Sequence, residues 1–216
     1  MNGAALMKRF RETSPRLKAR IAGLILTLVL VTAAFTEFFL RGRLSFTADF
    51  VVGFIEISGM IAVPLLLYDI FRPVNRSLSL LAAILNLVGL VFELLQIQPR
   101  GVNVGMGIYG LDCILIGYLI FRSTFVPRIL GVLMAIAGFC WLPYLWPQLE
   151  NRLSPLNLAS ALLLEGLVFL WLLVMGVNAQ RWKEQASAAD ASIDARKLPD
   201  LAAMGNTPAQ GPRTSP

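Results

Sequence analysis

Six long apolar stretches constrain the fold of this chain more than any motif in it does. A helix needs about 20 apolar residues to cross the hydrocarbon core of a bilayer, because each residue advances the helix by about 1.5 Å. The stretches that meet or approach this length are 21–40, 51–71, 78–97, 102–121, 129–147 and 156–177. Only 15% of the residues are charged, well below the share in a soluble domain. The sequence therefore predicts an all-α, polytopic membrane protein built as a bundle of six transmembrane helices.

The distribution of basic residues predicts how these helices are oriented. All but four of the 19 Lys and Arg residues lie before the first stretch, between the second and third, between the fourth and fifth, or after the last. Cytoplasmic loops are the ones enriched in Lys and Arg, so we expect both termini to be cytoplasmic and the protein to lie in the cell membrane. Four arginines are expected to anchor the inner turns: Arg72, Arg76, Arg122 and Arg128. Asp69 is expected to pair with Arg72 or Arg76. Because orientation explains the net charge of +6, we expect no nucleic-acid partner.

Composition divides the chain into three parts. Residues 1–20 form a basic cytoplasmic arm, which we expect either to set the topology alone or also to contact anionic lipid headgroups. Residues 21–180 form the transmembrane domain, whose partner is the lipid bilayer. Residues 181–216 carry too little apolar surface to offset the entropy of ordering, so they predict a cytoplasmic tail that is largely disordered, above all after residue 198. The sequence leaves homo-oligomerisation open.

The absence of histidine from the sequence removes several classes of catalytic site. Zinc proteases with paired histidines, Ser–His proteases and bis-histidine haem sites all need this residue. The two cysteines, Cys113 and Cys140, lie inside apolar stretches and do not have the spacing of a metal site. The glycines at 105, 107 and 110 match a dinucleotide-binding pattern, but no strand precedes them, and together with Gly101 they fit close helix packing. We therefore expect no enzyme, no catalytic residues, no cofactor and no metal.

Five acidic residues inside the apolar stretches are the candidate functional residues. They are candidates for binding a cation or a proton: Glu37, Glu56, Glu93, Asp112 and Glu165. Counted from the basic residue at the inner end of each helix, the four glutamates all lie about 16–17 residues along, which predicts one common depth near the outer headgroups. Asp112 is expected near the midplane. A charge in hydrocarbon costs about 2.5–3.5 kcal/mol, so these side chains should face a cavity or a partner rather than lipid.

Two functions fit this pattern. A structural or regulatory membrane protein would pair its acids with the outer arginines and so lock the bundle. A small ion- or proton-coupled transporter or channel would instead use the acids to bind a cation or to relay protons. Carboxylates that converge on a shared pocket favour transport, whereas acids that each pair with an arginine favour the structural role. The outer arginines are Arg41, Arg43, Arg100 and Arg152.

Several stretches carry a resemblance to a known family. They include Leu67-Tyr-Asp-Ile-Phe-Arg-Pro-Val-Asn-Arg76, Gly117-Tyr-Leu-Ile-Phe-Arg-Ser-Thr-Phe-Val-Pro-Arg128 and Gly176-Val-Asn-Ala-Gln-Arg-Trp-Lys183. Over residues 14–185 the chain resembles DUF4386, a large, mostly bacterial family of multi-pass membrane proteins described only as a domain of unknown function. The resemblance implies an integral membrane protein and brings no site residues with it. The echo between residues 68–72 and 118–122 fits either an internal duplication or convergence at two inner helix ends.

Overall fold

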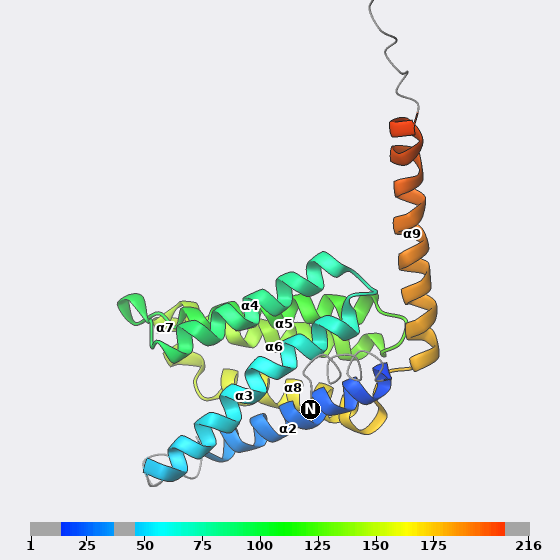
Figure 1. The fold of residues 1–216 in the computed structure, drawn as a ribbon. Coiled ribbons are helices and arrows are strands. Elements are labelled where there is room, and N and C mark those ends of the chain that lie inside the picture. The colour runs from blue at the N-terminus through cyan, green and yellow to red at the C-terminus, as the bar shows by residue number, and fades with distance from the viewer. Residues whose placement is uncertain (1–13, 37–45, 206–216) are drawn as a thin grey trace, which may run out of the picture.

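The structure, a computed structural model, describes residues 14–36 and 46–205 and is built on six long helices (Figure 1). All six are long and apolar enough to cross a membrane, α6 together with the 3-10 turn that continues it to Leu145, and the described residues contain no strand. The all-α, six-helix prediction is therefore confirmed. The six helices are α2 (Pro15–Phe35), α3 (Phe46–Phe71), α4 (Arg76–Leu94), α5 (Val104–Arg122), α6 (Arg128–Trp141) and α8 (Leu156–Met175).

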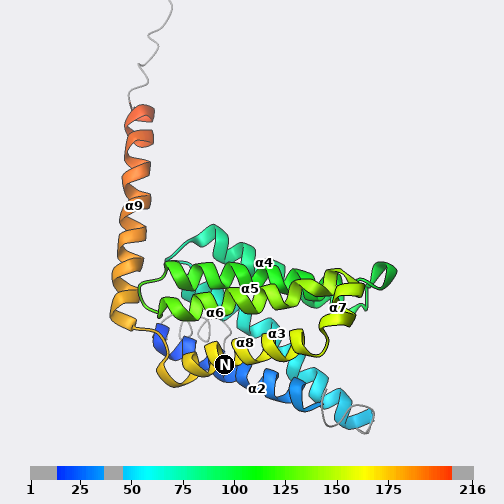
Figure 2. The same ribbon diagram turned by 180° about the vertical axis from the view of Figure 1, so that it is seen from behind.

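Four shorter or more polar elements complete the described chain. The 3-10 turn η3 (Leu142–Leu145) continues α6, and α7 (Pro147–Leu153) and the turn η2 (Pro99–Gly101) lie at one end of the bundle. Helix α9 (Ala179–Gly205) projects away from the opposite end (Figures 1 and 2). We call these two ends the α7 end and the α9 end.

Helix α9 covers much of the segment 181–216, for which the composition predicts a tail that is largely disordered after about residue 198. Its first turn is capped by Asn178, whose Oδ1 accepts hydrogen bonds from the backbone N–H groups of Gln180 and Arg181 at 3.1 Å. The residues that follow are mostly Ala, Gln, Glu, Lys and Arg, which have high intrinsic helix propensity. Local backbone bonding therefore makes this segment a helix without an apolar core, and residues 206–216 lie outside the described residues.

The helices begin where polar side chains cap them rather than where the apolar stretches begin. Ser14 accepts a hydrogen bond from the Leu17 N–H at 3.3 Å, and Pro15 occupies the first turn of α2. Asn75 and Asn103 cap α4 and α5 in the same way, each at 3.0 Å. Helix α2 therefore starts before residue 21, and the last residues of the predicted basic arm belong to the first transmembrane helix.

The six long helices contact one another in a closed cyclic order. Each packs against the next in the chain, from α2 through α3, α4, α5 and α6 to α8, and α8 packs back against α2. This order leaves a shared interior between all six helices. Chain order alone does not close the ring, because α2 and α8 are the first and last of the six.

Glycines bring the backbones of α5 and α6 into direct contact. A Cβ atom on Gly117 would lie 2.7 Å from the Gly131 carbonyl oxygen, and one on Gly110 would lie 2.8 Å from that of Gly138. Gly105 and Gly107 also pack closely, against α4 and η3 respectively. The predicted packing role of the glycines at 105, 107 and 110 is confirmed. It is wrong for Gly101, which has nothing within 4 Å and adopts φ +77° in the turn η2 instead.

Candidate functional site

A small cavity lies at the centre of the helix ring. The centre of a water molecule can occupy about 10 Å³ of this cavity. The cavity therefore has room for about one water. Each of the six long helices contributes at least one lining residue. Most of these side chains are apolar, and the polar ones are Asn86 on α4 with Tyr109 and Asp112 on α5.

Asp112 is the acid that lines this cavity. It is 4% exposed, and its Oδ2 accepts a hydrogen bond from Asn86 Nδ2 at 2.7 Å. The carbonyl oxygen of the Asn86 side chain, Oδ1, is buried and has no hydrogen-bond partner within the described part of the chain. A buried polar oxygen beside a water-sized space is the arrangement that an internal water fills.

Glu165 is a second buried acid, and it joins three helices. It lies on α8 with 0% exposure and accepts hydrogen bonds from Tyr109 Oη at 3.0 Å and Cys113 Sγ at 3.5 Å, both on α5. Trp141 Nε1 on α6 also donates to its Oε1. The Tyr109 and Trp141 rings meet edge-on, with their centroids 5.7 Å apart. All three donors are neutral groups.

Tyr109 connects the two acids. Its hydroxyl group bonds to Glu165, and its side chain also lines the cavity beside Asp112. A hydroxyl group both donates and accepts hydrogen bonds, so it can pass a proton between neighbours. The polar groups therefore follow one another from Asn86 through Asp112, the cavity and Tyr109 to Glu165. We call these four residues, with Cys113 and Trp141, the central site.

No basic side chain balances the two central acids among residues 14–36 and 46–205. The ion pairs found there both involve Asp69, with Lys18 and Arg72 as its partners. The predicted outer arginines Arg41 and Arg43, and the candidate Glu37, lie outside the described residues. Neither described outer arginine, Arg100 or Arg152, pairs with Glu165 or Asp112.

The other described candidates lie apart from the central site. Glu93, near the end of α4, contacts the Asn103 side chain and the Met106 backbone at the start of α5, where a helix dipole favours a carboxylate. Glu56 on α3 is half-buried, and its Oε1 has no hydrogen-bond partner among the described residues. No group of three or more Asp, Glu, Cys or His side chains in the described ranges could hold a metal ion. The structure thus brings Asp112 and Glu165 together, and no described contact joins Glu56 or Glu93 to them.

Sequence reasoning missed most partners of the central acids. Tyr109, Asp112 and Cys113 are spaced so that they share one face of a helix, which was a usable signal. Asn86 was a second signal, since it is an amide near the middle of an apolar stretch. The contact of these residues with Glu165 depends on how the ring closes, and a single sequence does not reveal it.

The predicted inner arginines all lie at the α9 end of the bundle. Arg72 Nε lies 3.4 Å from Asp69 Oδ1, which confirms the expected pair, and the Arg128 guanidinium lies 5.8 Å from the centroid of the Phe121 ring. Arg76 is the first residue of α4 and Arg122 the last of α5. Lys18 also pairs with Asp69, a contact that the sequence did not predict.

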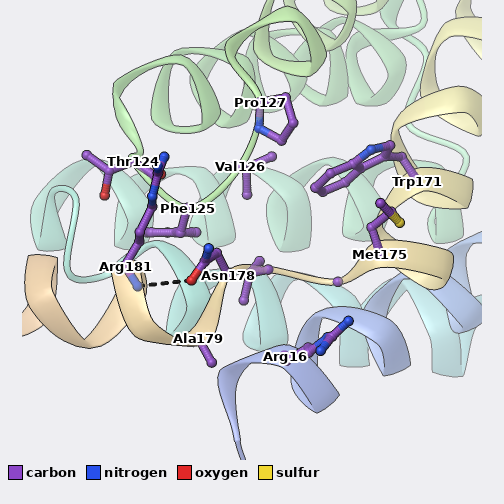
Figure 3. A pocket seen from close by; sticks show the side chains of 12 residues that line it. Arg16, Thr124, Phe125, Val126, Pro127, Trp171, Met175, Asn178, Ala179 and Arg181 are labelled. Atoms are coloured by element: carbon purple, nitrogen blue, oxygen red, sulfur yellow. Dashed lines mark hydrogen bonds between the residues drawn. The ribbon is translucent and has the colours of Figure 1, made fainter.

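A larger pocket of about 510 Å³ opens at this same end. It lies between the first turn of α2, residues 124–127, the end of α8 and the start of α9 (Figure 3). Arg16 and Arg181 line it, and its lining residues in the described part of the chain include no acid. This pocket shares no lining residue with the central cavity.

Comparison with known proteins finds a family model that matches part of the chain. Residues 89–176 match the model of a family described as Domain of unknown function (DUF4386), and the chain is DUF4386-like over this range. The matched range includes Tyr109, Asp112, Trp141 and Glu165 of the central site, but not Asn86. No curated protein and no solved structure matches the chain.

Proposed function

We propose that this DUF4386-like chain is a non-catalytic membrane protein that binds and releases a proton at the centre of its helix ring, as a proton-coupled carrier does. One observation carries the proposal. Asp112 and Glu165 are buried between the helices, connect through Tyr109, and have no basic partner among the described residues.

The cost of burying a charge explains why this arrangement supports proton binding. An ionised carboxylate in a low-dielectric interior needs a fixed cation beside it, a bound ion, or a proton. A fixed cation is missing from the described surroundings of both acids. The cavity has room for about one water, so it is too small for a metabolite. A proton is the species that fits, with Tyr109 and a cavity water as its carriers.

The proposal includes an orientation in the cell membrane with both termini on the cytoplasmic side. The basic residues of the described chain gather at the α9 end, which supports placing that end in the cytoplasm. We also propose that the basic arm, residues 1–20, contacts anionic lipid headgroups there.

Infrared spectroscopy of the protein in lipid tests the proton site. We expect wild-type protein to show a carboxyl band that changes with pH, and we expect Asp112→Asn and Glu165→Gln each to remove part of that change, because the amides keep the shape and cannot exchange the acid proton. Glu93→Gln is the matched control, since Glu93 lies near the end of α4, contacts the start of α5 and is outside the central site. Full retention of the change in both test variants overturns the proposal.

A structural or regulatory role is the second candidate, and a different observation favours it. Glu165 accepts hydrogen bonds from donors on α5 and α6, so it cross-links three helices. The thermal midpoint of the same Glu165→Gln protein separates the two roles. The amide has one acceptor oxygen for three donors, so a structural acid predicts a loss of about 1–3 kcal/mol in stability. An acid kept for function predicts equal or greater stability in the variant.

A further inference from the structure

We propose that the pocket at the α9 end binds the phosphate-bearing headgroup of an anionic phospholipid. This inference rests on the proposed lipid contact of the basic arm and goes beyond it by naming the site. The residues that recognise the headgroup are Arg16, in the first turn of α2, and Arg181, near the start of α9 (Figure 3).

The charge of the pocket selects an anion. Arg16 and Arg181 both line it, and none of its described lining residues is an Asp or Glu that would neutralise them. The Arg16 side chain has no hydrogen-bond or ion-pair partner within residues 14–36 and 46–205, and the Arg181 side chain makes a 3.4 Å hydrogen bond from Nη1 to the Thr124 carbonyl. Guanidinium groups bind phosphate oxygens through two parallel N–H donors, so two arginines around one cavity suit a phosphate group.

The backbone holds these two arginines in place. Gly176 follows α8 with φ +67°, and a Cβ atom there would lie 2.9 Å from Arg16 Cγ, so the first turn of α2 packs directly on the end of α8. Asn178 caps α9 and accepts a hydrogen bond from the Arg181 backbone N–H at 3.1 Å, the contact drawn in Figure 3. The pocket is thus built by close packing of separate chain segments and does not depend on one helix end.

The position and apolar wall of the pocket favour a lipid over a free anion. Met175, the last residue of the α8 span, and Trp171, one turn earlier, line the pocket beside the charged groups. Val174 and Leu170 on the same helix are exposed, so an apolar surface continues from the pocket along α8. A phospholipid has a charged head and apolar chains that match both parts, whereas inorganic phosphate contacts only the arginines.

The test measures lipid binding by the purified full chain in detergent, with the thermal midpoint of unfolding as the readout. We expect phosphatidylglycerol to raise the thermal midpoint in a saturable way, because it binds the folded protein only. Arg16→Gln and Arg181→Gln should each raise the half-saturating concentration about tenfold, the factor that one charge-assisted hydrogen bond supplies. Both side chains are exposed, so we expect both variants to fold, and either one alone is sufficient for the test.

Matched controls identify the source of any effect. Lys183→Gln removes an exposed charge two residues from Arg181 and should change the half-saturating concentration by less than about twofold. Equal stabilisation by phosphatidylcholine, or by inorganic phosphate at the same concentration, overturns the assignment to an anionic phospholipid. Replacing Lys8, Arg9 and Arg11 together by Gln distinguishes the arm from the pocket. If this change abolishes binding while the Arg16 and Arg181 variants bind normally, the pocket is wrong and the proposed contact of the arm remains.

Discussion

The Asp69 carboxylate joins α2 to α3 at the α9 end of the bundle. It forms ion pairs with Lys18 on the neighbouring helix α2 and with Arg72 at the end of its own helix. The Lys18 side chain is 7% exposed and that of Asp69 is 22% exposed. A charge at this degree of burial is stabilised only while its partner is present, because solvent screens it little. Among the described residues, the Lys18–Asp69 ion pair therefore links two transmembrane helices.

Lys18→Met tests this link at the scale of one residue. Methionine keeps much of the apolar stem and removes the charge, leaving Asp69 with Arg72 alone, so we expect a loss of about 1–3 kcal/mol in unfolding free energy. Unfolding by denaturant in detergent micelles measures it. Lys183→Met, at an exposed position, is the control, and a double-mutant cycle with Asp69→Asn isolates the pair. Equal stability of the two lysine variants is incompatible with a structural link.

The α5–α6 hairpin is the most closely packed pair of elements in the described structure. Gly117 and Gly131 face each other across it, and Gly110 and Gly138 do the same further along. In lipid, where no hydrophobic effect drives helices together, such close backbone contact is a main source of association. The hairpin also carries Tyr109, Asp112 and Trp141, so its packing positions the central site.

Gly117→Ala tests the packing of this hairpin. The new Cβ atom would lie 2.7 Å from both the Gly131 oxygen and the Ala135 nitrogen, so the helices must separate, at a cost of about 1–3 kcal/mol. Gly166→Ala on α8 is the matched control, because nothing lies within 4 Å of its Cβ position and alanine is the better helix former there. We expect the first change to lower the thermal midpoint and the second to leave it unchanged or raise it. A Gly117→Ala protein as stable as the control variant rules out close backbone contact at this point.

At the scale of the whole molecule, the described residues form a basic end and an end with fewer basic residues. Arg16, Lys18, Arg72 and Arg181 lie at the α9 end, while Arg100 and Arg152 lie near the α7 end. Since positive charge is retained on the cytoplasmic side during insertion, this asymmetry predicts the orientation of the entire ring.

Reporter fusions test that orientation. A reporter fused after Lys183 should be active in the cytoplasm, and one inserted beside Ser154, just after α7, should be active only outside. The paired design is its own control, because the two sites must give opposite results. An external signal from the fusion after Lys183 rejects the model with both termini inside.

The sequence by itself determined the features that depend on neighbours along the chain. Six spans follow from local hydropathy, the Asp69–Arg72 pair from a spacing of one helical turn, and the packing role of Gly110 from its place in a glycine-rich helix. Where local signals compete, the sequence was less informative. Capping by Ser14 moved the start of α2, and helix propensity extended α9 into a segment whose composition suggested disorder.

The tertiary structure alone decided which buried groups meet. Lys18 and Asp69, Asn86 and Asp112, and Tyr109 and Glu165 are each brought together from different helices, and hydropathy does not record which side of an apolar helix faces which neighbour. The spacing along the sequence places the four glutamates at one depth. It does not distinguish whether they face one another, face lipid or lie at a helix end. Closure of α8 onto α2 determined that Glu165 lies inside the ring beside Tyr109, while Glu93, near the end of α4, contacts the start of α5. The physical reason is that the cost of a buried charge depends on its partners in space, and those partners are set by the packing of all six helices.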